Sequence, residues 1–174
     1  MMRIWIDGDG CPSQCKEVLF KAAMRRQVPL VMVANRLLKV PLSDFVSRIV
    51  VACLPDAADH VIYKNVTPDD IVISTDFRLI RGVLSKGAYA LNSRGKTFTT
   101  ESFGRSGYVR AAKMSDIYHH NLVSHKQASF SKRDKAQFAN ALDRLLTRIE
   151  QNNTHIVSVT ASYKLTNISL SKFA

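Results

Sequence analysis

The chain has 174 residues, 46% of them hydrophobic, with three cysteines and a formal net charge of +11 at pH 7. This length suits one domain with an appended element, and such a domain buries about 70% of its unfolded surface. Three cysteines exclude a disulfide framework, and no apolar run approaches the ~20 residues that span a bilayer, so we expect a cytoplasmic protein without a membrane partner. The positive charge favours polyanions, above all nucleic acid.

The first part of the chain alternates short apolar runs with a segment of helical periodicity. Residues 2–6 form an apolar run that ends at the sequence Asp-Gly-Asp-Gly (residues 7–10), which predicts a buried strand entering a tight loop. A helix is predicted to open at Pro12-Ser13, and residues 28–34 form a second apolar run. A strand, a helix and a strand in this order predict two parallel strands joined by a right-handed crossover.

Three further strands are predicted at residues 46–53, 70–75 and 88–91, with helices between them. The expected fold class is therefore α/β, with a small and mostly parallel sheet flanked by helices. Ser131 is a candidate N-cap for a last helix that carries an apolar stripe from Phe138 to Ile149. Residues 151–174 contain no acid and are rich in Ser, Thr and Asn, and we interpret them as an edge strand or a mobile tail.

Acidic residues follow the predicted strands at the same end of each strand. Asp7 and Asp9 follow the first strand, Asp59 follows the third, and Asp76 follows the fourth. Ligands of parallel α/β sheets bind beyond these carboxyl ends, and crowded carboxylates take up protons or bind a cation. Hard oxygen ligands suit Mg²⁺ or Mn²⁺, so these four aspartates are predicted metal ligands and Asp7, Asp9 and Asp76 predicted catalytic residues.

Simpler interpretations compete with this one. A lone Asp after a strand is usually a turn or N-cap residue, and we expect that for Asp56 and, beside Pro68, for Asp69 and Asp70. Cys11 and Cys15 are four residues apart and could face the same way. Because no C-x-x-C pair or His-x-x-x-His partner accompanies them, structural thiols are preferred to a zinc site.

Acids that hold a cation, set in a basic chain, predict a metal-dependent nuclease or phosphodiesterase acting on RNA. Arg36, Arg94 and Arg133 are the candidate phosphate contacts, since they follow strands or begin a helix. One alternative is a non-catalytic module that binds RNA or the ribosome. Another is a phosphatase for a small metabolite.

An ordered series of motifs also resembles a known family, the YaiI/YqxD family of uncharacterised bacterial proteins. The resemblance covers about residues 1–150 and lies in the segments IWIDGDGCP (4–12), VAN (33–35), DAAD (56–59), TD (75–76), ALNSRG (90–95) and FSKRDKAQFANALD (130–143). That family looks like a branch of the PIN-like superfamily, whose better-known members are metal-dependent ribonucleases.

The resemblance implies a PIN-like three-layer sandwich over residues 1–150 and places Asp7, Asp9, Asp59 and Asp76 in an acidic cluster around Mg²⁺ or Mn²⁺. It implies no substrate, because the family has none assigned. Two departures stand out. Gly8 and Gly10 replace the usual alanines of a D-A-D-A-C-P motif, and residues 123–127 (VSHKQ) replace a glycine-rich TGGP-like segment.

Overall fold

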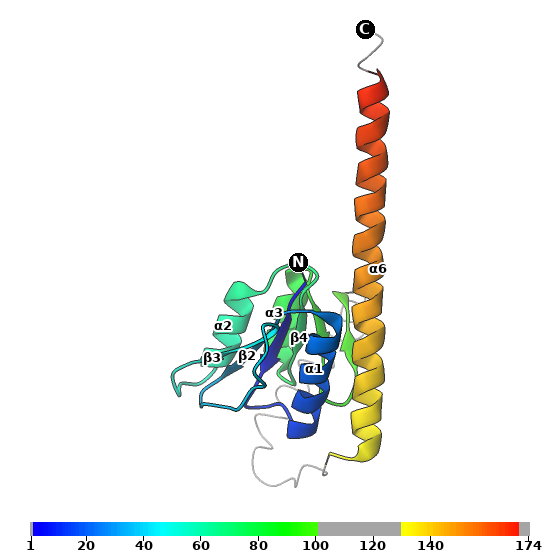
Figure 1. Ribbon diagram of the computed structural model, residues 1–174. Helices are drawn as coiled ribbons and strands as arrows, with labels where there is room; N and C mark the ends of the chain where they lie inside the picture. The colour runs from blue at the N-terminus through cyan, green and yellow to red at the C-terminus, as the bar shows by residue number, and fades with distance from the viewer. Residues whose placement is uncertain (1, 101–129, 171–174) are drawn as a thin grey trace.

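A six-stranded sheet lies at the centre of the computed structural model, which describes residues 2–100 and 130–170 (Figure 1). The sheet has the order β3-β2-β1-β4-β5-β6, and every neighbouring pair is parallel except β5 with β6. The expected α/β class with a mostly parallel sheet is confirmed. The strands are β1 (Ile4–Asp7), β2 (Leu30–Ala34), β3 (Val46–Val50), β4 (Ile71–Ile73), β5 (Tyr89–Leu91) and β6 (Thr97–Phe98).

Helices cover both faces of the sheet and make three layers. Helices α1 (Ser13–Arg26) and α6 (Lys132–Leu170) pack on one face, and α2 (Ala57–Asn65) and α3 (Phe77–Ser85) pack on the other. Side chains of a strand alternate between the two cores, so Ile4 and Ile6 face α1 while Trp5 faces α2 and α3. Burial on both faces explains why the strands read as continuous apolar runs.

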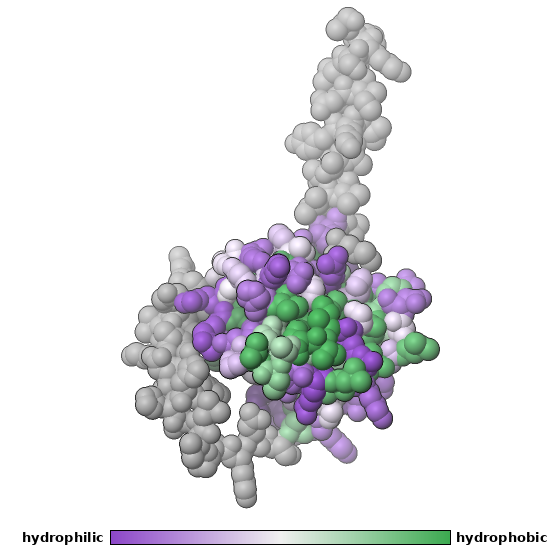
Figure 2. All heavy atoms as spheres, turned by 90° about the vertical axis from the view of Figure 1, so that its left-hand side faces the viewer, coloured by the Kyte–Doolittle hydropathy of each residue, from purple (hydrophilic) through white to green (hydrophobic). Residues whose placement is uncertain are grey.

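Strand β3 forms one edge of the sheet and is shorter than the predicted strand at residues 46–53. Only Val46 of this strand is buried. After Val50 the chain leaves the sheet, and Leu54 then lies 67% exposed. Figure 2 shows apolar side chains gathered on this side of the molecule. Leu42, which precedes β3 in the chain, is also fully open to solvent. An edge strand has one neighbour, so its β-branched sequence does not ensure pairing along its full predicted length.

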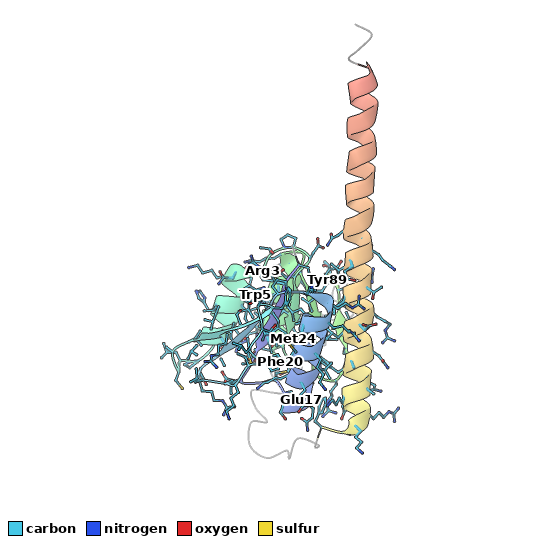
Figure 3. The ribbon with its side chains drawn as sticks, viewed as in Figure 1. Arg3, Trp5, Glu17, Phe20, Met24 and Tyr89 are labelled. Atoms are coloured by element: carbon cyan, nitrogen blue, oxygen red, sulfur yellow. The ribbon has the colours of Figure 1, made fainter. Side chains whose placement is uncertain are left out.

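Asp70 closes the predicted turn, since its amide donates to Thr67 O at 3.2 Å, and it is also a buried anchor, which the sequence did not predict. Its carboxylate accepts hydrogen bonds from the Arg3 amide at 2.8 Å, the Trp5 indole at 3.0 Å, and the Thr67 amide and hydroxyl at 2.9 and 3.0 Å. Figure 3 shows Arg3 and Trp5 at the start of β1. Asp69 does occupy a turn, with φ at 68°. The carboxylate of Asp70 satisfies buried donors that would otherwise be left without partners.

Helix α6 begins with the predicted cap. The Ser131 hydroxyl accepts a hydrogen bond from the Asp134 amide at 3.1 Å, and the Asp134 carboxylate accepts one from the Ser131 amide at 2.9 Å. This reciprocal pair satisfies donors that the first turn leaves open. The predicted apolar stripe packs against α1 and the sheet; its buried members are Phe138, Ala141, Leu142, Leu145, Leu146 and Ile149.

The backbone of α6 stays helical as far as Leu170, which corrects the expectation of an edge strand for the residues after Glu150. Residues 132–170 contain neither glycine nor proline. Once a helix is nucleated and anchored, each further residue adds a hydrogen bond at little entropic cost, so nothing in this segment ends it. Among the described residues no helix is long and apolar enough to cross a membrane.

Candidate functional site at the carboxyl edge of the sheet

The connections that follow β1 and β4 run in opposite directions across the sheet, so they diverge beside β1. The chain passes from β1 to β2 and β3 on one side, and then returns to β4 on the other side. Loops that leave β1 and β4 therefore separate, and this is where open parallel sheets bind ligands. A hollow of about 10 Å³ lies there, room for one water-sized body, and its lining residues are Asp7, Gly10, Cys11, Ile73, Ser74, Thr75 and Ser93.

Asp7 is the last residue of β1 and faces this hollow. Its Oδ1 atom accepts hydrogen bonds from the Asp9 amide at 3.3 Å and the Gly10 amide at 3.4 Å. Burial raises the pKa of Asp7 above its ordinary value, the two amide hydrogen bonds lower it in part, and the charges of Asp9 and Asp76 raise it further. No hydrogen bond from a described residue reaches the other oxygen of Asp7, Oδ2.

The two glycines of this loop allow a close approach that alanine would not. A Cβ atom at Gly10 would lie 2.9 Å from Asp7 Oδ2, and one at Gly8 would lie 2.9 Å from Met32 Cγ and 3.1 Å from Val33 O. The Gly8 amide also donates to Val33 O at 2.7 Å. Glycine in place of the alanines of related motifs thus lets the loop lie against β2 and the Asp7 carboxylate.

Asp9 turns toward β2 instead of toward Asp76. Its Oδ2 atom accepts a hydrogen bond from the Asn35 amide at 2.7 Å, and its Oδ1 atom lies 3.3 Å from Arg36 Nε. That Oδ1 atom is buried and accepts no hydrogen bond, because the guanidinium lies near it without the right alignment. Arg36, a predicted phosphate contact, is therefore paired with an acid of the same edge.

Asp76 caps helix α3. Its Oδ1 atom accepts hydrogen bonds from the Arg78 amide at 2.6 Å and the Leu79 amide at 3.1 Å. Its Oδ2 atom lies 4.0 Å from the Arg78 guanidinium, which also lies 3.8 Å from Asp56 Oδ1. Asp76 thus resembles Asp7: backbone amides hold one oxygen, and the second makes no hydrogen bond with a described residue.

Asp59 lies in the first turn of α2. Together with Asp7 and Asp76 it makes up a group of three acids, which we call the acidic group. Burial raises its pKa to about 7, and the charges of Asp76, Asp7 and Asp56 act in the same direction while Arg78 opposes them. Asp59 makes no hydrogen bond or ion pair with any residue that the structure describes. The structure therefore brings Asp7, Asp59 and Asp76 within electrostatic reach of one another. Their roles as metal ligands, and that of Asp9, stay predictions. As the side chains stand, no three His, Cys, Asp or Glu residues within 2–100 and 130–170 form a metal-binding group.

Of the other two predicted arginines, Arg94 lies in the loop between β5 and β6, and Arg133 lies in the first turn of α6. Arg94 Nη1 is 3.6 Å from Asp134 Oδ1, and Arg133 is exposed. Hydrogen bonds from Ser131 lower the pKa of Asp134 most, and the charges of Arg94 and Arg133 lower it further. Both cations therefore act on the same carboxylate, and Arg94 directly follows Ser93 of the hollow. The predicted loop at residues 123–127 lies outside the described residues.

Two features of the site were missed by the sequence reasoning. Ser74 is buried, and its hydroxyl accepts a hydrogen bond from the Asp76 amide at 3.0 Å. Cys11 and Cys15 are buried, the Cys11 thiol donates to Pro12 O at 3.7 Å, and the Cys15 thiol donates to Ser93 O at 3.5 Å. The interaction of the two thiols raises the pKa of Cys11 and lowers that of Cys15. Their spacing of four residues was the available signal, although it indicated only that the thiols could face the same way.

Fold and site define a three-layer α/β protein with an acidic group at the switch point of a parallel sheet. The chain belongs to the YaiI/YqxD family, described as uncharacterised, whose model matches residues 5–148. It is 42% identical over 146 residues to a UPF0178 protein of Alkalilimnicola ehrlichii, covering 84% of this chain and 98% of that protein. A UPF0178 protein of Maridesulfovibrio salexigens is 41% identical over 147 residues, covering 84% of this chain and 97% of the relative. No solved structure matches the chain.

Proposed function

We propose that the protein is a divalent-cation-dependent phosphodiesterase, acting as a nuclease on RNA. The observation that carries the proposal is Asp59, a carboxyl group without a partner among the described residues, whose pKa is raised to about 7 by burial and by its acidic neighbours. A group held in this way either keeps a proton or favours a cation. A pKa near neutrality also suits the transfer of a proton to or from a reacting water.

The carboxylates fit an Mg²⁺ or Mn²⁺ ion in one further respect. Backbone amides hold Oδ1 of Asp7 and Oδ1 of Asp76, which fixes each carboxylate and leaves its Oδ2 atom for a ligand. Such an ion, when bound, supplies Lewis acidity toward a phosphodiester and an activated water. Asp9 supports the edge from the β2 side, where one of its buried oxygens accepts no hydrogen bond.

RNA is the proposed substrate because of charge. The chain carries +11 at pH 7, Arg94 directly follows Ser93 of the hollow, and the charges of Arg94 and Arg133 both act on Asp134. The Arg94 guanidinium pairs with Asp134 but is 56% exposed, and Arg133 is exposed as well, so a phosphate can compete for both groups. Binding carried by such contacts weakens steeply as salt rises.

The direct test is cleavage of single-stranded RNA with Mn²⁺ or with EDTA. Asp7→Asn, Asp59→Asn and Asp76→Asn should each abolish Mn²⁺-stimulated cleavage, because each removes a negative charge from the group. Asp44→Asn is the matched control, since Asp44 is an exposed aspartate outside the group. Unchanged cleavage by Asp7→Asn and Asp76→Asn would show that the assignment is wrong.

A non-catalytic RNA-binding module is the second candidate. It is favoured by the ion pairs Arg36–Asp9 and Arg94–Asp134, and by the absence of a three-ligand group among the described side chains. This candidate predicts salt-sensitive RNA binding that persists in EDTA, with intact RNA after long incubation. Measuring RNA cleavage and RNA binding in Mn²⁺ and in EDTA therefore separates the two functions.

A further inference from the structure

Strand β3 presents a free edge of backbone polar groups. Its ladder with β2 begins at the carbonyl of Phe45 and ends at the amide of Val51. The bonds of a parallel ladder use alternate residues, so the odd-numbered positions of β3 face β2. The N–H and C=O groups of Arg48 and Val50 therefore point away from the sheet, and no described residue hydrogen-bonds to them. Residues 47–50 are exposed, so this edge is open to a further strand.

Apolar side chains surround this edge. Five of the seven exposed large hydrophobic residues that the structure describes lie in β3 or in the loops on either side of it: Leu37, Leu42, Ile49, Val50 and Leu54. Figure 2 shows apolar side chains gathered on the side of the molecule that carries β3. An unguarded strand edge and an exposed apolar surface each favour contact with another chain, and here the two coincide.

We propose that two copies of this chain pair through β3 in antiparallel fashion, about a two-fold axis beside Ile49, and so join two six-stranded sheets into one. Arg48 of each copy then lies opposite Val50 of the other, and each of these two pairs exchanges two hydrogen bonds across the edge. The two Ile49 residues face each other at the axis. An interface of this kind uses the same surface on both copies, so the assembly closes at two.

Charge selects this register and a second copy as the partner. Arg48 is the one charged residue of β3, and a register centred on it would place two arginines directly opposite each other, which is unfavourable. A register centred on Val50 would pair Arg48 with Ala52, which has already left the strand. The register centred on Ile49 opposes each arginine to a valine. A partner attracted by the net charge would be acidic, but β3 offers it a single cation, whose guanidinium already donates to Leu38 O at 2.9 Å.

The pairing leaves the acidic group of each copy open. Antiparallel strands point the carboxyl edges of the two sheets in opposite directions, so the two hollows lie at opposite ends of the joined sheet and the inference does not depend on the proposed function. Two copies that each carry +11 repel one another. Dimerisation should therefore strengthen as salt rises, whereas the proposed RNA binding should weaken.

Sedimentation velocity of the full-length protein over a concentration series tests the dimer. The wild type should show a monomer–dimer equilibrium in the micromolar range. Val50→Pro removes one outward N–H group from each copy and no bond to β2, so two of the four hydrogen bonds across the edge are lost and the dissociation constant should rise by about tenfold or more. Val50→Ala keeps the N–H group and is the matched control, with a smaller rise.

A disulfide trap in a Cys53→Ser background tests the register. The Cα atoms of a non-hydrogen-bonded antiparallel pair lie about 4.5 Å apart, so Ile49→Cys should form an intermolecular disulfide in a glutathione buffer. Ser47→Cys is the matched control, because Ser47 is also exposed and lies on the same face of β3. In the proposed register its two copies are about 13 Å apart along the strands, which is too far for a disulfide.

Each outcome decides one statement. A wild type that stays monomeric at about 100 μM in high salt overturns the dimer. Dimerisation of Val50→Pro with the affinity of the wild type overturns pairing through β3. Equal disulfide yields from Ser47→Cys and Ile49→Cys overturn the register. A dimer that weakens as salt rises would contradict the apolar edge as its basis, because charged groups elsewhere would then hold it together.

Discussion

Replacing Asp59 with asparagine should stabilise the protein at alkaline pH and leave its stability unchanged in acid. Its pKa rises from 3.8 to about 7 on folding, so the folded state holds a proton that the unfolded state releases between these values. Stability contributed by the protonated group is therefore present below pH 3.8 and is lost as pH rises through 7. The shift of three units corresponds to about 4 kcal/mol at most.

That upper value must be reduced, because Asp59 is partly exposed and solvent screens its neighbours. About 1–2 kcal/mol is the expected gain for Asp59→Asn above pH 7, which raises Tm by roughly 3–6 °C in a chain of this length. Thermal unfolding in EDTA measures the stability at pH 4 and at pH 8, near the two ends of the pH range over which Asp59 loses its proton. Asp44→Asn, at an exposed position outside the group, serves as the control.

Equal stability of wild type and Asp59→Asn at pH 8 would refute the convergence of Asp7, Asp59 and Asp76. A gain of the same size at pH 4 would refute its electrostatic origin, since the carboxyl is then neutral in the folded state. With Mn²⁺ in place of EDTA, the sign should reverse at pH 8, because the wild-type carboxylates would gain a ligand that the variant lacks.

Three further changes probe what holds the site in place. Asp70→Ala should destabilise the protein by about 3 kcal/mol in urea unfolding, because it leaves the buried Trp5 indole without an acceptor; loss of under 1 kcal/mol would contradict this. Phe138→Ala, at a fully buried position, should cost about 3–5 kcal/mol, and a small effect would mean that α6 is weakly docked. Gly95→Ala should destabilise more than Gly87→Ala: both have positive φ, but a Cβ at Gly95 would lie 2.8 Å from Gln137 O whereas at Gly87 the nearest atom is 3.5 Å away. Equal losses, measured by thermal unfolding, would count against that clash.

Much of the sheet could be predicted because buried parallel strands carry a strong sequence signal. Strands β1 and β4 are apolar on both faces; Asp7 is the last residue of β1, and Asp76 follows β4 after Ser74 and Thr75. The rule that parallel strands end at one edge then places both acids together. Strand β6, with two residues, has no comparable signal and was not predicted.

The direction in which a loop side chain points could not be predicted from the sequence. Asp9 follows Asp7 by two residues, yet the Asn35 amide and Arg36, more than twenty residues away in the chain, decide where it points. Asp70 likewise follows a turn residue, and its role depends on donors from Arg3 and Trp5 at the start of the chain. Contacts between distant segments leave no periodic pattern that a local reading could detect.

The course of α6 has a practical consequence for anyone attaching a reporter to this protein. The helix starts beside the acidic edge and runs to the opposite end of the molecule, and its residues after Ile149 add about 30 Å of backbone beyond the packed stripe (Figure 1). A fluorophore or fusion partner joined past Leu170 would thus be carried far from the hollow. Tethering a substrate at that end would be a poor way to deliver it to Asp59.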